Sequence, residues 1–287
     1  MKIKAPLGER VFRVFNCVFL GLIGFVCLYP MWHVLMASFS DSTALTAHSG
    51  LLLWPIDFSL DAYKRVLTNR NIWTGYWNTI KFLVLGVSTS MVMTTLGAYV
   101  LSRRDFMLRR PIMLAITFTM FFSGGTIPTY LNIQELKLTG SIWGLVLPFC
   151  IATYNMIILR TAFESMPESL LEAARIDGAG QLDCLIRIVL PLNKATLSVI
   201  ALYYGVSCWN AWFWASQVLE SKTKMPLAVI LRDILINADM QQMDNGVTNM
   251  EGIKYATIIV ATVPILCVYP FIQKYFAQGV MIGAVKE

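Results

Sequence analysis

Long apolar runs separated by short polar segments dominate this chain of 287 residues. A membrane-spanning helix needs about 20 predominantly apolar residues. Stretches of that kind lie at about 11–36, 79–101, 111–131, 142–162, 197–215 and 255–272. The pattern predicts an all-α polytopic membrane protein with six transmembrane helices, forming a single transmembrane domain over residues 1–287. Breakers inside the runs predict kinks at Pro30, the Ser123-Gly124-Gly125 segment, Pro148, Pro264 and Pro270.

Basic residues at the ends of the runs predict the orientation, because cytoplasmic segments beside spans carry an excess of Lys and Arg. The N-terminal arm has four, and the turn after the second run has four more: Lys2, Lys4, Arg10, Arg13, Arg103, Arg104, Arg109 and Arg110. We therefore expect a plasma-membrane protein with both termini in the cytoplasm. The loop at about 164–192 would then be cytosolic, and the loops at about 37–78 and 216–254 would be external.

Each of the two external loops contains an amphipathic stretch behind a helix start signal. In the first loop, Ser59 precedes Leu60, Tyr63, Val66 and Leu67. In the second loop, Pro226 precedes Leu227, Ile230, Leu231, Ile234 and Leu235. We expect short helices on the outer rim, which either dock an external partner or pack as a lid on the chain's own spans.

Composition narrows the function classes. The chain is 56% hydrophobic and only 14% charged, against about 25% charged residues in soluble proteins. Its net charge of +6 does not indicate nucleic-acid binding, because the Lys and Arg residues flank apolar runs instead of covering one soluble face. We expect contact with membrane lipid and no nucleic-acid partner. The six cysteines have no spacing typical of a metal site, so none is predicted.

The polar segment between the fourth and fifth runs has the pattern of two short helices joined by a turn. Ser165 and Glu168 have the spacing of a capping box, with Pro167 near the first helical position. Gly178 and Gly180 supply a stop that tolerates left-handed backbone. We expect the first helix to end there.

Apolar residues give each of these helices a side to bury. In the first helix they are Leu170, Leu171, Ala174 and Ile176, and in the second they are Leu182, Leu185, Ile186 and Val189. Proline interrupts a helix by removing a backbone donor. We therefore expect the second helix to break at Leu190-Pro191, ahead of the fifth run.

The same segment carries a spaced motif. It reads Glu172-Ala173-Ala174, three residues, Gly178, nine residues, Ile188, one residue, and Leu190-Pro191. This resembles, at every defining position, the EAA motif of permease subunits of ATP-binding cassette importers. The spans, the Trp209-Asn210-Ala211-Trp212 stretch and the tail from Lys274 to Lys286 are similar to the carbohydrate-import branch related to the second maltose-transporter permease. The stretch from Gly124 to Tyr130 further resembles the Gram-positive oligosaccharide and lipo-oligosaccharide permeases.

The resemblance implies an importer-permease fold in which this loop forms cytosolic coupling helices that seat in a cleft of an ATPase. The coupling residues would be Glu172, Ala173, Ala174, Asp177, Gly178, Ile188, Leu190 and Pro191. In that role Glu172 would pair with a basic residue of the ATPase, the alanines would allow close approach, and Gly178 would permit the turn. Alternatively, Glu172 is a solvated charge on a surface helix.

The resemblance also implies a function and partners. The chain would move a sugar or oligosaccharide across the bacterial plasma membrane by alternating access. Its partners would be a second homologous permease subunit, two ATP-binding subunits and an extracellular sugar-binding protein.

The energy source would lie outside this chain. No Gly-x-x-x-x-Gly-Lys-Ser/Thr phosphate loop occurs in it, so ATP would be bound by the partner subunit. We therefore expect a non-catalytic subunit without a cofactor. The alternative is an ion-driven secondary carrier or channel. Such proteins usually place ionisable residues inside spans, and the runs contain essentially none between their ends.

Neutral polar and aromatic residues are the candidates for a translocation path. In the fifth run, Tyr203, Ser207, Asn210 and Trp214 fall at helical spacing on one face, and Asn155 lies in the fourth run. Asn beside Trp or Tyr suits the hydroxyls and weakly apolar faces of sugars. Alternatively, Asn210 bonds across helices and the tryptophans form an interfacial belt. The resemblance adds that in maltose-type systems the partner permease supplies most sugar contacts.

Overall fold

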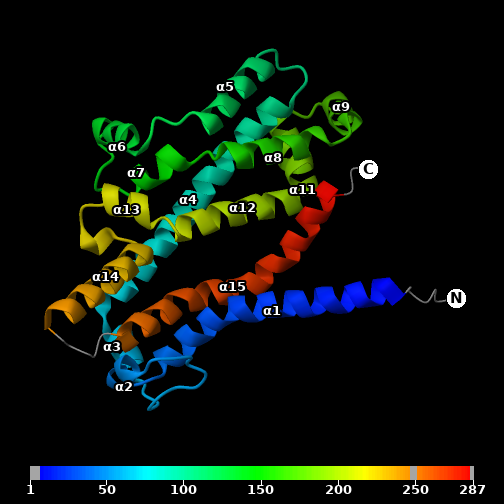
Figure 1. The fold of residues 1–287 in the computed structure, drawn as a ribbon. Helices are drawn as coiled ribbons and strands as arrows, with labels where there is room; N and C mark the ends of the chain where they lie inside the picture. The colour runs from blue at the N-terminus through cyan, green and yellow to red at the C-terminus, as the bar shows by residue number, and fades with distance from the viewer. Residues whose placement is uncertain (1–6, 246–250, 285–287) are drawn as a thin grey trace. The chain divides into compact units, whose positions relative to one another are not determined.

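Helices make up nearly all regular structure in the computed structural model, which describes residues 7–245 and 251–284 (Figure 1). Among these residues, the one extended pairing is an isolated bridge between Ser40 and Phe58. The all-α class predicted from the sequence is confirmed. The chain divides into two compact units. The first contains Met1–Arg70 with Asp233–Val263, and the second contains Asn71–Arg232 with Pro264–Glu287.

The first unit is built on α1 (Leu7–Ser38), α2 (Ser42–Ala47), α3 (Asp61–Thr68) and the first half of α15 (Glu251–Ala284). The connection after α2 is tied back to α1, because Trp32 donates through Nε1 to the carbonyl oxygen of Leu53 at 3.0 Å. Ser38, at the end of α1, shares a hydrogen bond of 2.7 Å with the hydroxyl of Tyr63 on α3. These bonds fix the predicted external loop at the end of α1.

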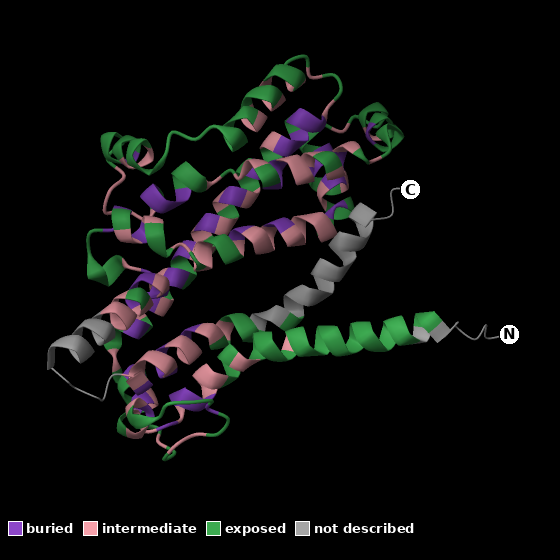
Figure 2. Cartoon of the chain, in the orientation of Figure 1, coloured by how far each residue is buried: buried purple, intermediate pink, exposed green. Residues whose placement is uncertain are grey.

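Helix α1 is apolar along most of its length, and its most apolar stretch is not covered by other described residues of the chain. Its segment Val11–Ser38 has a mean hydropathy of 2.2, and none of its most apolar stretch is buried within the described residues. Most of α1 is accordingly drawn as exposed in Figure 2. Such a surface requires lipid or another apolar partner. The helix has the length and composition predicted for the span at 11–36.

The second unit contains most of the remaining helices. In chain order they are α4 (Arg70–Ser102), α5 (Arg109–Phe121), α6 (Thr126–Glu135), α7 (Trp143–Val146), η1 (Leu147–Phe149), α8 (Thr153–Glu164), α9 (Glu168–Ile176), α10 (Gln181–Asp183), η2 (Cys184–Val189), α11 (Leu190–Leu192), α12 (Lys194–Trp209), α13 (Trp212–Val218), η3 (Lys222–Lys224) and the start of α14 (Leu227–Asn245). Helix α4, with a mean hydropathy of 1.6, is long and apolar enough to be the span predicted at 79–101.

Two of the expected spans are bent pairs of helices, and a third bend separates the 181–192 segment from the helix of the fifth expected span. The angle is 118° between α5 and α6, 52° between the α7–η1 segment and α8, and 86° between the α10–α11 segment and α12. Breaks near Gly124 and Pro148 were predicted, and the bend at Asn193 lies two residues after the break predicted at Leu190-Pro191. Gly125 has a φ of 89°, which other residues rarely adopt. The turn there is therefore much sharper than a kink, and a single crossing helix over 111–131 is wrong.

The sixth expected span, at 255–272, lies within α15. That helix contains Pro264 and Pro270 in its interior. The side chains of the tail residues from Lys274 onward lie outside the described residues. With each bent pair taken as one span, the described residues supply up to five spans by length and composition. The total of six stays a prediction.

Both predicted rim helices are present, with different buried faces. In α3 the buried residues are Ala62 and Val66, while Leu60 and Leu67 are exposed. The start of α14 packs as expected, because Leu227 and Ile230 are buried. The backbone N–H of Leu227 also donates to the Thr79 hydroxyl of α4 at 2.8 Å. The start of α14 is thus fixed on α4.

Close backbone approach fixes α7 in the second unit. A Cβ atom on Gly144 would be pressed against the carbonyl oxygen of Leu138 and would lie 2.8 Å from the side chain of Val218. Neither distance is compatible with a larger residue, and the backbone oxygen cannot move as a side chain can. Glycine is therefore required at this position.

Candidate functional site

The segment at 164–192 begins with α9, whose start differs from the predicted one. The cap is Pro167, with φ −58° and ψ 126°, and it makes no side-chain capping bond. Ser165 instead closes the preceding helix, where its hydroxyl donates to the carbonyl oxygen of Ala162 at 2.8 Å. The predicted capping box is wrong because Ser165 belongs to the last turn of α8. Glu168 lies 3.4 Å from Arg104.

The end of α9 is the predicted glycine turn. Gly178 has a φ of 81°. Its N–H donates to the carbonyl oxygen of Arg175 at 3.1 Å, and the N–H of Ala179 donates to that of Ala174 at 2.9 Å. These two bonds form a Schellman motif, which satisfies the carbonyls left free at a helix end. A residue with a Cβ would strain the backbone at position 178.

The second helix of the segment does not break at Leu190-Pro191. Residues Cys184–Val189 form a π-helix, and the N–H of Leu190 donates to the carbonyl oxygen of Leu185. Helical backbone continues through α11 to Leu192, and the chain turns at Asn193. The break before the fifth run therefore lies two residues later than predicted, because the wider π turn lies just ahead of Pro191, where a regular helix would need the missing donor.

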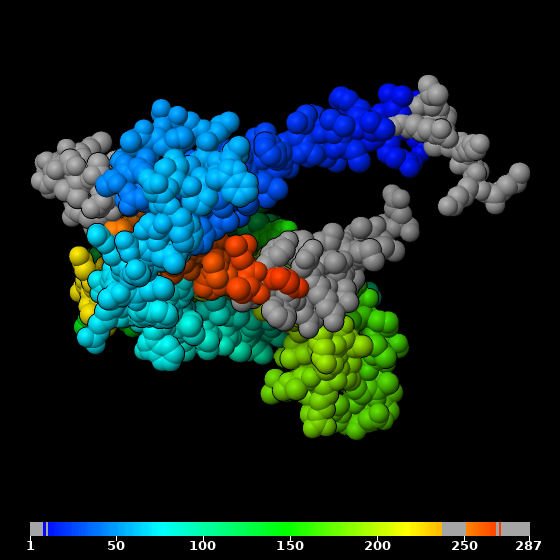
Figure 3. Space-filling view, turned by 90° about the horizontal axis from the view of Figure 1, so that it is seen from below, coloured from blue at the N-terminus to red at the C-terminus, as the bar shows by residue number. Residues whose placement is uncertain are grey.

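Asn193 fastens the two ends of the segment together. Its side-chain nitrogen donates to the carbonyl oxygen of Val189 at 2.9 Å and to the sulfur of Met166 at 3.0 Å. The residue is 8% exposed. Since Met166 precedes α9 and Val189 ends the π-helix, the segment is a closed loop, and we call it the 164–192 loop. Figure 3 shows the green and lime surface that includes it projecting from the second unit.

One side of the 164–192 loop belongs to the main core. Its buried residues Leu171, Cys184, Leu185 and Val189 share a hydrophobic cluster with Leu159 and Phe163 of α8 and Ile200 of α12. The other side faces solvent and carries apolar side chains: Ile176 is 86% exposed, Leu182 65% and Ile186 60%. An apolar surface that is exposed on a rigid base suits a protein partner.

The residues of the spaced motif divide between these two sides. Glu172, Ala173, Asp177, Gly178 and Pro191 are exposed, whereas Ala174, Ile188 and Leu190 are half-buried. The last three pack against the hydrophobic cluster. The fold thus presents the acidic and small residues of α9 outward and uses the apolar ones as an anchor.

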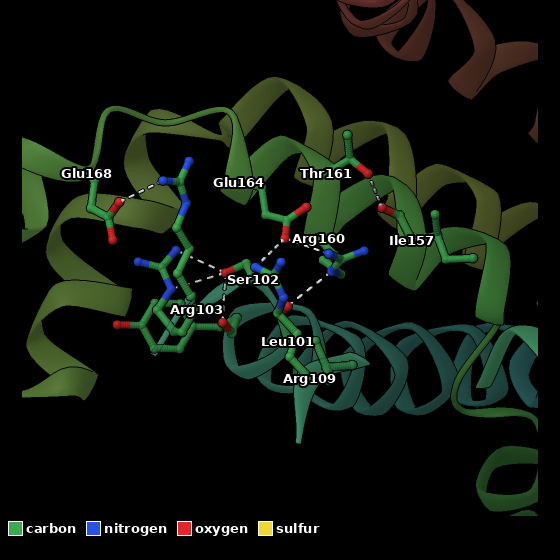
Figure 4. Close-up of polar contacts among 11 residues, drawn as sticks. Leu101, Ser102, Arg103, Arg109, Ile157, Arg160, Thr161, Glu164 and Glu168 are labelled. Atoms are coloured by element: carbon green, nitrogen blue, oxygen red, sulfur yellow. Dashed lines mark hydrogen bonds and ion pairs between the residues drawn. The ribbon is translucent and has the colours of Figure 1, made fainter. Parts of the chain in front are cut away.

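Ion pairs fix the base of the loop (Figure 4). Glu164 accepts from Arg109 at 3.1 Å and from Arg160 at 2.6 Å. Arg160 also donates through Nε to the carbonyl oxygen of Leu101 at 3.0 Å. This group was not predicted from the sequence. The spacing of Arg160 and Glu164, one helical turn apart, was the available signal, but the approach of Arg109 depends on tertiary structure.

Further contacts connect the loop with the end of α4. The hydroxyl of Tyr99 donates to the side-chain oxygen of Gln181 at 2.9 Å, and Arg103 lies over the ring of Tyr99 at 4.8 Å. On the surface, Arg175 pairs with Asp105 at 3.5 Å. A cavity of about 420 Å³ lies between the end of α4 and α9. Its lining includes Arg103, Arg104, Asp105, Glu164, Glu168, Glu172 and Arg175.

The predicted translocation residues are not brought onto one helical face. Helix α12 ends at Trp209, so Tyr203 and Ser207 lie on it, Asn210 caps it, and Trp214 belongs to α13. The side chain of Asn210 donates to the carbonyl oxygen of Val206 at 3.1 Å. The single face is wrong because the helix stops before Trp214. A role for these residues in transport stays a prediction.

The remaining candidate, Asn155, is buried in α8 at 6% exposure. A neighbouring polar contact was not predicted from the sequence. The hydroxyl of Tyr204 shares a hydrogen bond of 2.6 Å with Thr94 and accepts from the N–H of Ala152 at 3.0 Å. These two bonds join α12 to α4 and to the start of α8. In the described part of the chain, no cluster of three His, Cys, Asp or Glu residues could hold a metal ion.

Membrane-length apolar helices and a polar two-helix loop seated in their core define the architecture of a transporter's membrane subunit. The chain belongs to the family of binding-protein-dependent transport system inner membrane components, whose pattern matches residues 9–282.

Two relatives come from Bacillus subtilis (strain 168). The polygalacturonan/rhamnogalacturonan transport system permease protein YtcP is 41% identical over 286 residues, covering 98% of this chain and 100% of that protein. Protein LplC is 38% identical, covering 96% and 95%.

A solved structure is also similar, that of a bacterial ABC transporter involved in the import of the acidic polysaccharide alginate. It matches with a TM-score of 0.88 and 35% identity, covering 96% of this chain and 100% of that chain. A second, the bacterial alginate ABC transporter in complex with an alginate pentasaccharide-bound periplasmic protein, matches with a TM-score of 0.62 and 16% identity over 92% and 93% of the two chains. At that identity the likeness concerns the fold alone.

Proposed function

We propose that this chain is a permease subunit of an ATP-driven importer of a sugar or oligosaccharide in a bacterial plasma membrane. It would work with a second homologous permease, two ATP-binding subunits and an extracellular sugar-binding protein. The observation that carries the proposal is the two-sided 164–192 loop. Its motif residues Glu172 and Ala173 face solvent, while Leu171 and Leu185 are buried in the core that contains α4, α8 and α12. Because the buried side of the loop packs in this core, a displacement of the loop is transmitted directly to the spans.

The arginine-rich turn supports the proposed sidedness. Arg103, Arg104 and Arg109 lie at the same end of α4 and α5 as the 164–192 loop, since Arg104 pairs with Glu168 and Arg109 with Glu164. Excess positive charge beside spans favours the cytoplasm. The loop would then meet an ATPase there, and both termini would be cytoplasmic.

The proposed mechanism is alternating access without chemistry in this chain. Closure of two ATP-bound partner subunits would displace the 164–192 loop and turn the spans outward, and hydrolysis would reset them. The sugar class is supported by the relatives, since YtcP is named for polygalacturonan and rhamnogalacturonan transport and the 35% identical structure concerns alginate import.

Cross-linking from Ala173 tests the contact with the ATPase. In a background whose exposed cysteines Cys17, Cys27 and Cys267 are replaced, Ala173→Cys is expected to capture a subunit whose sequence contains a phosphate-binding loop. The matched control is Ile127→Cys on α6, which is 73% exposed and should capture no ATPase. Absence of an ATPase at Ala173, or equal capture at both sites, would remove the basis of the proposal.

The energy source separates this proposal from an ion-driven carrier. Uptake in cells should stop when ATP is depleted and continue when a protonophore collapses the proton gradient while ATP is maintained. The opposite result would favour the carrier.

The path role proposed for Asn210 predicts a kinetic change. This side chain is exposed at the end of α12 and bonds only to its own helix among the contacts that the structure describes. Asn210→Leu should alter the KM and rate of uptake while leaving assembly intact, because the leucine offers no hydrogen bond to a sugar hydroxyl. Transport kinetics measured for the sugar that the binding protein retains would decide this. An unchanged KM and rate of uptake would leave Asn210 with a role in helix capping only.

A further inference from the structure

Glu164, the last residue of α8, lies between two arginines from different helices (Figure 4). Its Oε1 accepts from Arg109 Nη1 at 3.1 Å and from Arg160 Nη2 at 2.6 Å. The carboxylate oxygen thus joins the end of α8 to the start of α5, and Arg160, which also donates to the carbonyl oxygen of Leu101, joins α8 to the last turn of α4.

This group differs from the other ion pairs of the loop in its burial. The side chains of Arg109, Arg160 and Glu164 are 25%, 18% and 28% exposed. In contrast, Arg104 and Glu168 are 78% and 54% exposed. Exposed pairs are screened by water and salt and contribute little, whereas removal of one partner from a half-buried group leaves charge without compensation. The Glu164 group is therefore the stronger connection.

The Glu164 group lies at the base of the 164–192 loop. Glu164 is separated from the first residue of α9 by Ser165, Met166 and Pro167 alone. The same point is held from the other end of the loop by Asn193, which bonds Met166. The base of α9 is therefore attached to α4, α5 and α8 together. The helix itself contacts the core through Leu171.

We infer that Glu164 is a positioning residue for coupling, which makes α4, α5, α8 and α9 move as one body when a partner displaces the 164–192 loop. This rests on the proposed function. Without the carboxylate charge, the Arg109 and Arg160 guanidinium groups repel one another at the junction of α5 and α8. Helix α9 then tilts on its own, and the displacement is lost before it reaches the spans.

Distances between spin labels test the inference in the assembled transporter. With the six native cysteines replaced, labels are placed at Met107→Cys, on the turn before α5, and Leu170→Cys on α9, which are 89% and 44% exposed. In the parent, the distance distribution should be narrow and the same without nucleotide and with ATP and vanadate. Glu164→Gln should broaden it in both states and shift it with ATP and vanadate. Glu164→Asp, which keeps the charge, should restore the parent distribution.

The matched control is Glu168→Gln, which removes a charge from an exposed pair of the same loop and should leave the distances as in the parent. Uncoupling should also raise ATP hydrolysis without binding protein by at least about fivefold in Glu164→Gln, which a purely structural role would not do. If Glu164→Gln fails to assemble, Arg109→Gln gives the same measurement from α5.

Three results would overturn the inference. They are a parent distribution that itself shifts with nucleotide, unchanged distances in the assembled Glu164 or Arg109 variant, and broadened distances with unchanged basal hydrolysis. Equal broadening in Glu168→Gln would likewise remove the special role of Glu164. Failure of the proposed function is seen separately, because no ATPase would then be captured at Ala173.

Discussion

Gly178→Val is expected to abolish most sugar uptake while leaving membrane insertion and expression intact. The φ of 81° at this position costs a residue with a Cβ about 1–2 kcal/mol, and a β-branched residue more. Apart from its chain neighbours, no atom of the described residues lies within 4 Å of the position that the new Cβ would occupy, so the effect comes from the backbone. Relief of the strain would rotate α9 against the helix that begins at Gln181. Uptake of the sugar that the binding protein retains is the measurement.

Two matched variants separate backbone conformation from side-chain size at the glycine turn. Gly178→Asn should keep most activity, because asparagine tolerates left-handed backbone. Gly180→Ala should be neutral, since Gly180 has a φ of −72° and its Cβ would meet Asp183 at an ordinary 3.5 Å. Equal activity of Gly178→Val and Gly180→Ala would show that the turn geometry is not needed for transport.

Charge reversal at Glu172 is expected to have the second large effect. Glu172 is exposed on α9, and the proposed function places its carboxylate against a basic residue of the ATPase. Loss of one partner from a buried, hydrogen-bonded charge pair costs about 2–5 kcal/mol, so Glu172→Lys should reduce uptake by about 30-fold or more. Uptake and ATP hydrolysis of the purified transporter should fall together, because the ATPase would no longer seat.

Controls for Glu172 address both charge and site. Glu172→Asp keeps the carboxylate and should retain part of the activity. Glu135→Lys makes the same reversal at an exposed position at the end of α6 and should leave uptake near the parent value. Normal transport by Glu172→Lys would return Glu172 to a solvated surface charge.

The fold class and the candidate site were predictable where a local signal decides the structure. The end of α9 at Gly178 was predictable because it depends only on the backbone conformation of that residue. The spans at 11–36 and 79–101 were predictable because hydropathy is high over one continuous helix. The outward position of Glu172 and Ala173 also follows from helical spacing, once Leu171 is buried.

Other features depend on contacts between distant residues. Pro191 carries a strong local signal for a break, but the π-helix ahead of it lets the helix continue to Leu192. Ser165 has the right spacing for a capping box, yet its hydroxyl donates to the carbonyl oxygen of Ala162 in the preceding helix. The junction at Glu164 needs Arg109, 55 residues away along the chain. No periodicity in the sequence predicts an ion pair between residues so far apart along the chain.

The bare surface of α1 has a consequence for how this sequence can drift over evolutionary time. Since its most apolar stretch gains no cover from the described residues of its own chain, lipid or a neighbouring subunit, and not this polypeptide, selects among Leu, Ile, Val and Phe there. Gly144, wedged against the backbone at Leu138, has no such freedom. Variation among descendants of this gene should therefore concentrate along the first helix and spare the seventh.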